Sequence, residues 1–269
     1  MPYRRSHKGI GFVPTMGYLH DGHRSLIRAA AKECDTVVVS IFVNPTQFAP
    51  HEDFSQYPRD IHRDTALVEG AGAGYLFVPS TEEMYSSAHS TSVIVEGLSS
   101  MLEGEFRPTH FKGVTTIVMK LLNIVQPQRA YFGQKDFQQS VIIQRMVDDL
   151  NIPVVIDVVP TVREHDGLAM SSRNKYLTDD ERKAAPVVYQ SLKAGKDLIT
   201  AGERNSGNVI EQIKKIIQTE PKAHIDYVSV VERDTCKQVD EVLPGVALVI
   251  ALAVRFGSTR LIDNIIVQV

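Results

Sequence analysis

The sequence is poor in the features that mark secreted and membrane-bound proteins. Its 269 residues contain only two cysteines, Cys34 and Cys236, which form neither a C-x-x-C pair nor a metal-binding spacing. They indicate small reduced core or surface side chains and no disulfide framework. No apolar run approaches the ~20 residues that a membrane helix needs, and no apolar segment of signal-peptide type follows the basic residues at 1–5. We therefore expect a soluble, cytoplasmic protein that does not contact membranes.

A strong excess of charge of either sign is also missing. The chain has 29 basic and 32 acidic residues and a net charge of −3, without the basic footprint of a nucleic-acid-binding protein. Nucleic acid, tRNA included, is therefore not an expected partner. With 43% hydrophobic residues the chain can bury a full α/β core.

Strand and helix patterns alternate through the first 160 residues. The strand patterns are continuous runs of Val, Ile and Phe, as expected where helices cover both faces of a parallel sheet. They lie at 10–13, 36–43, 75–78, 130–132 and 154–159, with helical patterns at 23–32, 58–69, 111–125 and 137–150. Pro58 and Asp136 are good helix-start residues. This predicts an α/β fold whose residues 1–163 form a doubly wound, Rossmann-like parallel sheet.

The pattern changes after Arg163. Helical patterns at 179–200 and 206–218 are followed by strand patterns at 226–231, 246–254 and 261–267. We expect residues 164–269 to form a second, smaller α+β domain that closes over the first as a lid. Pro186 lies inside the first of these helical patterns and should kink it or mark its true start.

Two histidines, His20 and His23, stand at the turn between the first strand and the first helix. A helix start favours an anion, because its first N–H groups lack intrahelical partners and the macrodipole is positive there. Histidines three residues apart share a face, and Gly22 lets backbone come close to a ligand. The turn is suited to hold the phosphates of a nucleotide, although a capped, solvated pair of surface histidines would give the same local pattern.

A second candidate phosphate-binding segment follows the strand pattern at 154–159. In this polar loop Ser171 and Ser172 supply two hydroxyls and Arg173 a guanidinium. An H-x-G-H turn together with such a loop resembles the pair used by nucleotidyl-transferring α/β enzymes that make adenylates. The two segments together are far more specific than either alone.

Other polar residues follow the strands of the predicted sheet, where ligands bind in open α/β folds. Gln47 follows the second strand, and its amide suits a hydroxy acid because it both donates and accepts, although 44–48 could be a plain Asn-Pro turn. Lys135 offers a point charge for phosphates and Gly133 allows close backbone approach. Asp136 caps the following helix or holds magnesium through water, and Gln139 faces the same cleft.

Seven segments together are very similar to the pantoate–β-alanine ligase (pantothenate synthetase) family, from about Gly11 to Val269. They are MGYLHDGH, VSIFVNPTQF, YPRD, MLEGEFRPTHFKGV, YFGQKDFQQ, DGLAMSSRNKYL and RLIDN. The resemblance implies ATP-dependent condensation of (R)-pantoate with β-alanine through pantoyl adenylate, with release of pyrophosphate and AMP. It also implies Mg²⁺ that arrives with the substrate ATP, no tightly bound cofactor, and a homodimer.

The resemblance also implies roles for individual residues. His23 matches the catalytic position, Gln47 and Gln139 match pantoate-binding glutamines, and Gln47 is also implied to lie near β-alanine. Asp136 and Asp64 are the candidate magnesium ligands. His110, Tyr57 and Asp64 match polar cleft positions. The implied ATP contacts are Met16, Gly17, Tyr18, Leu19, His20, Asp21, Gly22, His23, Gly133, Gln134, Lys135, Asp136, Val162, Met170, Ser171, Ser172 and Arg173.

Two departures from the family pattern stand out. Few residues precede Ile10, where the family generally has a further short strand and helix, and this departure bears on stability or dimer packing. Thr109 stands where the family generally has Gly before the His-Phe pair, and it should shift His110 if that position needs backbone angles open only to Gly. Taken without the family, the loop at 107–113 favours an ordinary anchor of the next helix.

Two other functions fit part of the pattern. One is a different H-x-G-H adenylyl- or cytidylyltransferase, which would join the nucleotide to a phosphate. Gln47 and Gln139 argue against it, because a phosphate acceptor should meet basic side chains. The other is a non-catalytic ATP-binding module, which would leave the polar pocket of the two glutamines unexplained.

Overall fold

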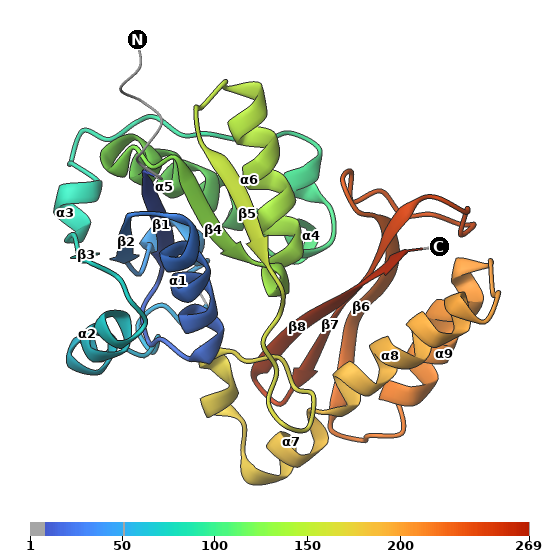
Figure 1. The fold of residues 1–269 in the computed structure, drawn as a ribbon. Coiled ribbons are helices and arrows are strands. Elements are labelled where there is room, and N and C mark those ends of the chain that lie inside the picture. The colour runs from blue at the N-terminus through green and yellow to red at the C-terminus, as the bar shows by residue number, and fades with distance from the viewer. Residues whose placement is uncertain (1–8, 51, 269) are drawn as a thin grey trace. The chain divides into compact units, whose positions relative to one another are not determined.

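The computed structural model describes residues 9–50 and 52–268, which divide into two compact units (Figure 1). Unit 1 contains the described residues up to Gln134 and residues 138–160. Unit 2 contains Lys135–Phe137 and the described residues from Thr161 onward. The basic residues at 1–5 and Val269, which entered the sequence analysis, lie outside the described residues.

Unit 1 is built on a five-stranded sheet whose neighbouring strands are all parallel. The order is β3-β2-β1-β4-β5, which confirms the predicted doubly wound fold. Its strands are β1 (Ile10–Thr15), β2 (Thr36–Ile41), β3 (Tyr75–Phe77), β4 (Arg129–Gly133) and β5 (Val155–Val159). The strand order reverses between β1 and β4, the place where ligands bind in such sheets. The H-x-G-H turn follows β1, and Gly133 ends β4.

Helices and short 3₁₀ segments connect these strands. They are α1 (Asp21–Glu33), η2 (Pro45–Gln47), α2 (Ile61–Gly70), α3 (Thr81–Met84), η3 (Leu98–Ser100), α4 (Glu103–Phe106), α5 (His110–Val125), η4 (Gln134–Asp136) and α6 (Phe137–Asp149). The sequence analysis missed the short helices α3 and α4. Pro58 was the wrong start for α2, because the Asp60 side chain accepts a hydrogen bond from Arg63 N and caps the helix there.

The core of unit 1 forms where α1 covers the sheet. Leu26, Ile27 and Ala30 recur on one helical face and pack with Val13 and Val39 of the strands. Burying each large apolar side chain contributes roughly 1.5–3 kcal/mol. The buried face of α1 thus fixes the helix start, and with it the two histidines, against the end of β1.

Unit 2 pairs helices with a separate antiparallel sheet, as predicted. Its order is β6-β7-β8, with a register shift between Ile225 and Tyr227 in β6. Pro186 is the N-cap of α8, so it marks a true helix start and the predicted long helix is two. The elements are η5 (Ser172–Tyr176), α7 (Asp179–Ala184), α8 (Val187–Thr200), α9 (Ser206–Ile217), β6 (Ala223–Glu232), β7 (Ala247–Phe256) and β8 (Thr259–Gln268).

Both cysteines are free and buried, Cys34 in unit 1 and Cys236 in unit 2. Burial raises the pKa of the Cys236 thiol to about 12, so the thiol stays protonated and behaves as a small apolar group. Among the described residues, no helix has the length and apolar character needed to pass through a bilayer.

Candidate active site

The H-x-G-H turn is organised by its own histidines. His20 is the N-cap of α1, and its Nδ1 accepts a hydrogen bond from Gly22 N at 3.1 Å. The Nδ1 of His23 accepts in return from His20 N at 3.3 Å, which completes a capping box made of two imidazoles. The structure thereby brings the two predicted histidines together, with their ring centroids 4.1 Å apart.

This pairing fixes the hydrogen-bonding character of both rings. A nitrogen that accepts a hydrogen bond carries no proton, so each neutral ring holds its proton on Nε2. The start of α1 therefore carries two ring N–H donors in addition to its positive dipole end. Two such donors side by side suit the oxygens of a phosphate chain.

Asp64, on α2, holds the same turn from behind. Its carboxylate is almost fully buried and accepts from Tyr18 N at 2.6 Å and from Leu19 N at 2.8 Å. The backbone there is unusual, with φ of 84° at Gly17 and 48° at Tyr18. The two bonds stabilise this conformation. A role for Asp64 in holding magnesium stays a prediction, and it would compete with these bonds.

Gln47 lies next to the H-x-G-H turn, with its Nε2 3.9 Å from the sulfur of Met16. The amide of the buried Asn44 donates to Gln47 Oε1 at 3.0 Å and to Gly113 O at 3.0 Å. Because its oxygen already accepts from Asn44, Gln47 offers mainly the N–H donors of its amide for further hydrogen bonds. Asn44 also caps η2, so the segment is an Asn-Pro turn that at the same time orients Gln47.

The segment before α5 holds the backbone of Gln47. Arg107 bonds both oxygens of Glu52 at 2.6 Å and donates to Gln47 O at 3.3 Å. His110 Nδ1 donates to the same carbonyl at 3.0 Å, and its Nε2 accepts from Arg107 at 3.4 Å. Burial raises the pKa of Glu52, but the hydrogen bonds and charge of Arg107 outweigh it and the net shift is downward. This segment supports the site as well as anchoring α5.

Thr109 fits its position without strain. Its φ is −95° and its ψ is −10°, which is ordinary right-handed helical backbone. Threonine therefore adopts the backbone angles of this position, and His110 does not have to shift to accommodate it.

The end of β4 and the start of α6 contain two adjacent glutamines with different surroundings. The amide of Gln138 is 4% exposed, donates to Leu98 O at 2.8 Å and Met101 O at 2.6 Å, and accepts from Glu103 N. Gln139 is half-buried, as the predicted ligand-binding role requires. A Cβ added to Gly133 would meet no atom within 4 Å, so packing does not demand glycine there.

A cavity of about 270 Å³ in unit 1 adjoins the H-x-G-H turn. Met16 and Gly17 line it together with Asp64. The rest of the wall comes from residues 41–43, Phe54, residues 59–61 and residues 78–81, which include both apolar and charged side chains. The cavity is close to the lower size limit of small-molecule sites. The H-x-G-H turn thus borders a cavity on the side of Asp64.

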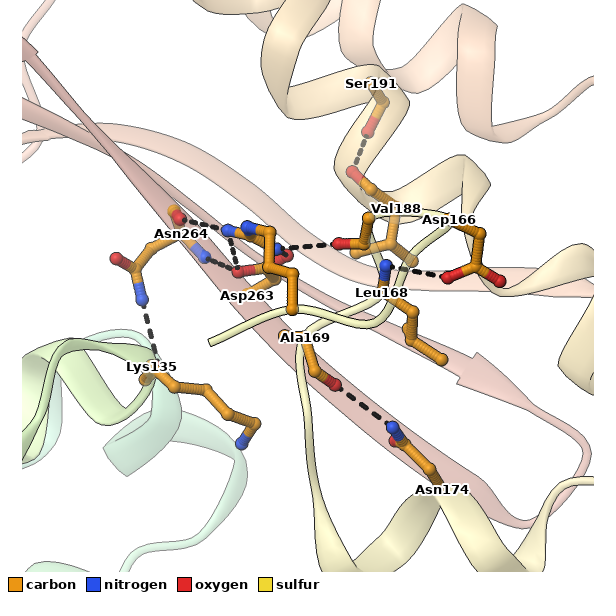
Figure 2. A network of polar contacts seen from close by, with 11 residues as sticks. Lys135, Asp166, Leu168, Ala169, Asn174, Val188, Ser191, Asp263 and Asn264 are labelled. Carbon is orange, nitrogen blue, oxygen red and sulfur yellow. Dashed lines mark hydrogen bonds and ion pairs between the residues drawn. The ribbon is translucent and has the colours of Figure 1, made fainter. Parts of the chain in front are cut away.

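In unit 2, residues 162–170 form a short two-stranded ribbon that contains two of the predicted ATP contacts, Val162 and Met170. Met170 N donates to Val162 O at 3.0 Å, Arg163 pairs with Ala169, and Glu164 to Gly167 form the tip. Ser171 caps η5 by accepting from Arg173 N at 3.3 Å. In Figure 2 this ribbon lies against β8.

Asp136 is the second carboxylate predicted as a magnesium ligand. Among the described residues, no group of three or more His, Cys, Asp or Glu side chains could hold one. Asp136 is half-exposed and 3.6 Å from Lys135 Nζ. The role of Asp136 in holding magnesium stays a prediction.

The sequence matches a known protein family over nearly its whole length. A model of the family described as pantoate-beta-alanine ligase matches residues 1–266. The chain belongs to this family. It is 55% identical over 260 residues to a pantothenate synthetase of Moorella thermoacetica, covering 97% of this chain and 91% of the relative. With a pantothenate synthetase of Carboxydothermus hydrogenoformans it shares 56% over 267 residues, covering 99% and 94%.

Solved structures of the pantoate-beta-alanine ligase family share the fold. A pantothenate synthetase from Thermus thermophilus has a TM-score of 0.92 and 47% identity, covering 96% of this chain and 92% of that one. A ligase from Francisella tularensis, solved in complex with "Beta-gamma ATP and Beta-alanine", has a TM-score of 0.78 and 37% identity, covering 95% and 88%.

Sequence reasoning missed the residues that support this ligase site. Arg107 and Gly113 stood in a quoted segment, but nothing in their spacing indicates that they contact the 44–48 turn. Asp64 was predicted as a polar cleft residue or a metal ligand, not as a support of the turn. Nothing in the sequence near Asp64 indicates its bonds to Tyr18 and Leu19.

Proposed function

We propose that the protein condenses (R)-pantoate with β-alanine to form pantothenate, using ATP and releasing AMP and pyrophosphate. The observation that carries this proposal is membership of the pantoate-beta-alanine ligase family along nearly the whole chain. The ATP and β-alanine named for the Francisella structure agree with two of the three substrates. We also propose a cytoplasmic location, a homodimer, and Mg²⁺ that enters with ATP.

In the first step a carboxylate oxygen of pantoate attacks the α-phosphorus of ATP. A bond forms between that oxygen and phosphorus, and the bond to the β-phosphate oxygen breaks, which gives pantoyl adenylate and pyrophosphate. Two anions must approach each other, so the site needs donors aimed at the phosphates. His20 and His23 supply Nε2–H groups at the start of α1, and Lys135 and Arg173 supply positive charge.

In the second step the amine of β-alanine attacks the acyl carbon of the adenylate. The amide C–N bond forms, the bond from the acyl carbon to the phosphate oxygen breaks, AMP leaves, and the amine loses a proton. Neither step needs a nucleophile from the protein. Gln47 suits the acid substrate, because its oriented NH₂ group donates to a carboxylate or hydroxyl oxygen. We assign Gln139 to pantoate as well.

The decisive experiment incubates the purified protein with pantoate, β-alanine and MgATP and measures every product. We expect pantothenate and AMP in equal amounts, without ADP. Exchange of labelled pyrophosphate into ATP should require pantoate and Mg²⁺ but no β-alanine, since the adenylate forms before the amine attacks. Release of ADP, or an absolute need for β-alanine in the exchange, would contradict the proposal.

A further inference from the structure

Two adjacent residues of β8, Asp263 and Asn264, are buried although both are strongly polar. Asp263 is 3% exposed and Asn264 2% exposed. They belong to the RLIDN segment, which has no task in the reaction as proposed so far. Buried polar side chains are costly unless their hydrogen bonds are satisfied, so their partners indicate what they do.

Asn264 contacts the segment that carries Lys135. Its Nδ2 donates to Lys135 O at 3.0 Å, and in Figure 2 the side chain of Lys135 extends away from this bond. The hydrogen bond thus holds the backbone of Lys135 and leaves its ammonium group directed elsewhere. Lys135 sits in the one-turn η4 between β4 and α6, where a short segment gains little order from its own hydrogen bonds.

Asp263 contacts the ribbon that leads into Met170 and Arg173. Arg163 donates to both of its carboxylate oxygens, at 2.6 and 3.0 Å, and also to Gly167 O at 3.1 Å. The guanidinium stacks on the ring of Tyr189, 3.7 Å from its centroid. Arg163 is therefore fixed by three partners, and its side chain links the first strand of the ribbon to the tip.

The two contacts are coupled through the backbone of Asn264. Asn264 N donates to Asp263 Oδ1 at 2.8 Å, and Arg163 also reaches Asn264 O at 3.4 Å. Burial raises the pKa of Asp263, and the charge of Arg163 acts against that rise. An apolar pair would often stabilise a core at least as well as such a buried ion pair. The buried Asp263–Arg163 pair is therefore better explained by the geometry that it imposes on its neighbours than by a gain in stability.

We propose that Asp263 and Asn264 are positioning residues. They hold Lys135 and the 170–173 segment in fixed positions relative to each other, as binding of ATP by both segments requires. This inference rests on the proposed function, in which both segments contact ATP. It goes beyond that function by giving the RLIDN segment a task in adenylate formation, although neither residue touches the substrate. The second half-reaction, attack by the amine, depends much less on the positions of these two segments, because pyrophosphate has already left.

The test measures the two half-reactions separately in Asn264→Ala. We expect pyrophosphate exchange to fall roughly 10- to 100-fold, while conversion of supplied pantoyl adenylate and β-alanine changes by less than about twofold, since small displacements of a positioned group cost about that much rate. Asn264→Asp keeps the shape but replaces the donor by an oxygen that repels Lys135 O. It should be impaired at least as much as Asn264→Ala.

Matched controls come from the same unit. Asn205→Ala removes the N-cap of α9, and Ser206→Ala removes a buried hydroxyl that donates to Val239 O, so both cost stability without contacting either ATP segment. For these controls the ratio of the two half-reactions should equal that of the unaltered protein. Asp263→Asn should instead lower the exchange reaction selectively, as Asn264→Ala does.

Each outcome has a clear meaning. If the unaltered protein shows no pantoate-dependent exchange, the proposed function fails. If it does, but Asn264→Ala slows both half-reactions equally or neither of them, the positioning role is overturned. Because a partly unfolded sample lowers both rates in proportion, the ratio remains interpretable even when the variant is less stable.

Discussion

Two turns of unit 1 hold candidate ligand-binding side chains by different means. In the H-x-G-H turn the two histidines bond each other's neighbouring backbone, within three residues of sequence. In the 44–48 turn the carbonyl of Gln47 is held by the side chains of Arg107 and His110, sixty or more residues later. The amide of Gln47 is oriented by Asn44, whose own amide also donates to the backbone carbonyl of Gly113. The histidines of the first turn stabilise each other, whereas the second turn is stabilised by Arg107 and by residues of α5.

This difference determines how each turn should respond to mutation. The histidine pair of the first turn should be damaged mainly by changes within the turn, whose one distant support named above is Asp64. A turn supported from a distance can be damaged by residues that never touch a ligand, because small displacements of a positioned group cost rate and affinity. The following four predictions test the contrast, in order of decreasing effect.

His23→Ala should give the largest loss, because it removes a donor at the nucleotide phosphates. We expect kcat to fall roughly 10²- to 10³-fold, as when one preorganised donor to developing charge is removed. Binding of ATP should fall less than the rate, and the fold should persist, since a helix cap contributes only about 1 kcal/mol. Steady-state kinetics and calorimetric titration measure the two quantities.

His62→Ala is the matched control, since His62 is an exposed histidine on the neighbouring helix α2. It should leave kcat unchanged. A His23→Ala protein with near-normal kcat would remove His23 from the chemistry.

Gly113→Ala should disturb the second turn from α5. A Cβ there would lie 2.4 Å from Thr46 O and 2.8 Å from Gln47 N, so the turn must move. We expect weaker saturation by pantoate and a stability loss of about 1–3 kcal/mol, typical of overpacking, with little change in ATP affinity. Gly70→Ala, at a position with open space, is the control. Unchanged pantoate saturation in Gly113→Ala would mean that α5 does not position Gln47.

The adjacent glutamines of α6 separate ligand binding from support within one helix. Gln139→Ala should weaken pantoate binding by about 1–3 kcal/mol, the cost of an unpaired polar partner, and leave thermal stability nearly unchanged. Gln138→Ala should do the reverse, because its amide bonds three backbone groups of residues 98–103. Calorimetric titration with pantoate and thermal unfolding of both variants measure this. Loss of ATP binding with intact pantoate binding in Gln139→Ala would reverse the assignment.

The Glu52–Arg107 pair should have the smallest effect, seen as pH dependence of stability. The pKa of Glu52 is lower in the folded protein than its ordinary value of 4.5. The pair therefore contributes its full stabilisation above pH 4.5, and the contribution is lost as the pH falls through the folded pKa. Glu52→Gln should show a shallower loss of stability below pH 4.5 in urea unfolding at a series of pH values. Parallel curves for the two proteins would contradict the pairing.

The same contrast explains what could be predicted from the sequence. The sheet, most helices and the H-x-G-H turn follow from periodicity and from capping residues close together in the chain. Asp64 bonds Tyr18 from 46 residues away, and Arg163 bonds Asp263 from 100 residues away. Such contacts depend on how elements pack, and no local spacing encodes them. The helix break at Pro186 lies between these cases, because proline allows both a kink and a start, and packing decides.

The register shift in β6 has a consequence for assembly of the chain with itself. β6 forms one edge of the sheet in unit 2 and is ten residues long. A long, regular edge strand offers a row of backbone donors and acceptors on which another strand can add, which leads to aggregation. The shift between Ile225 and Tyr227 interrupts the even spacing of that row, and it falls at Asp226, an acidic residue bonded to Arg255 and Arg260. An incoming strand could not keep regular backbone hydrogen bonds past this point. The irregularity therefore disfavours the addition of further strands at the β6 edge.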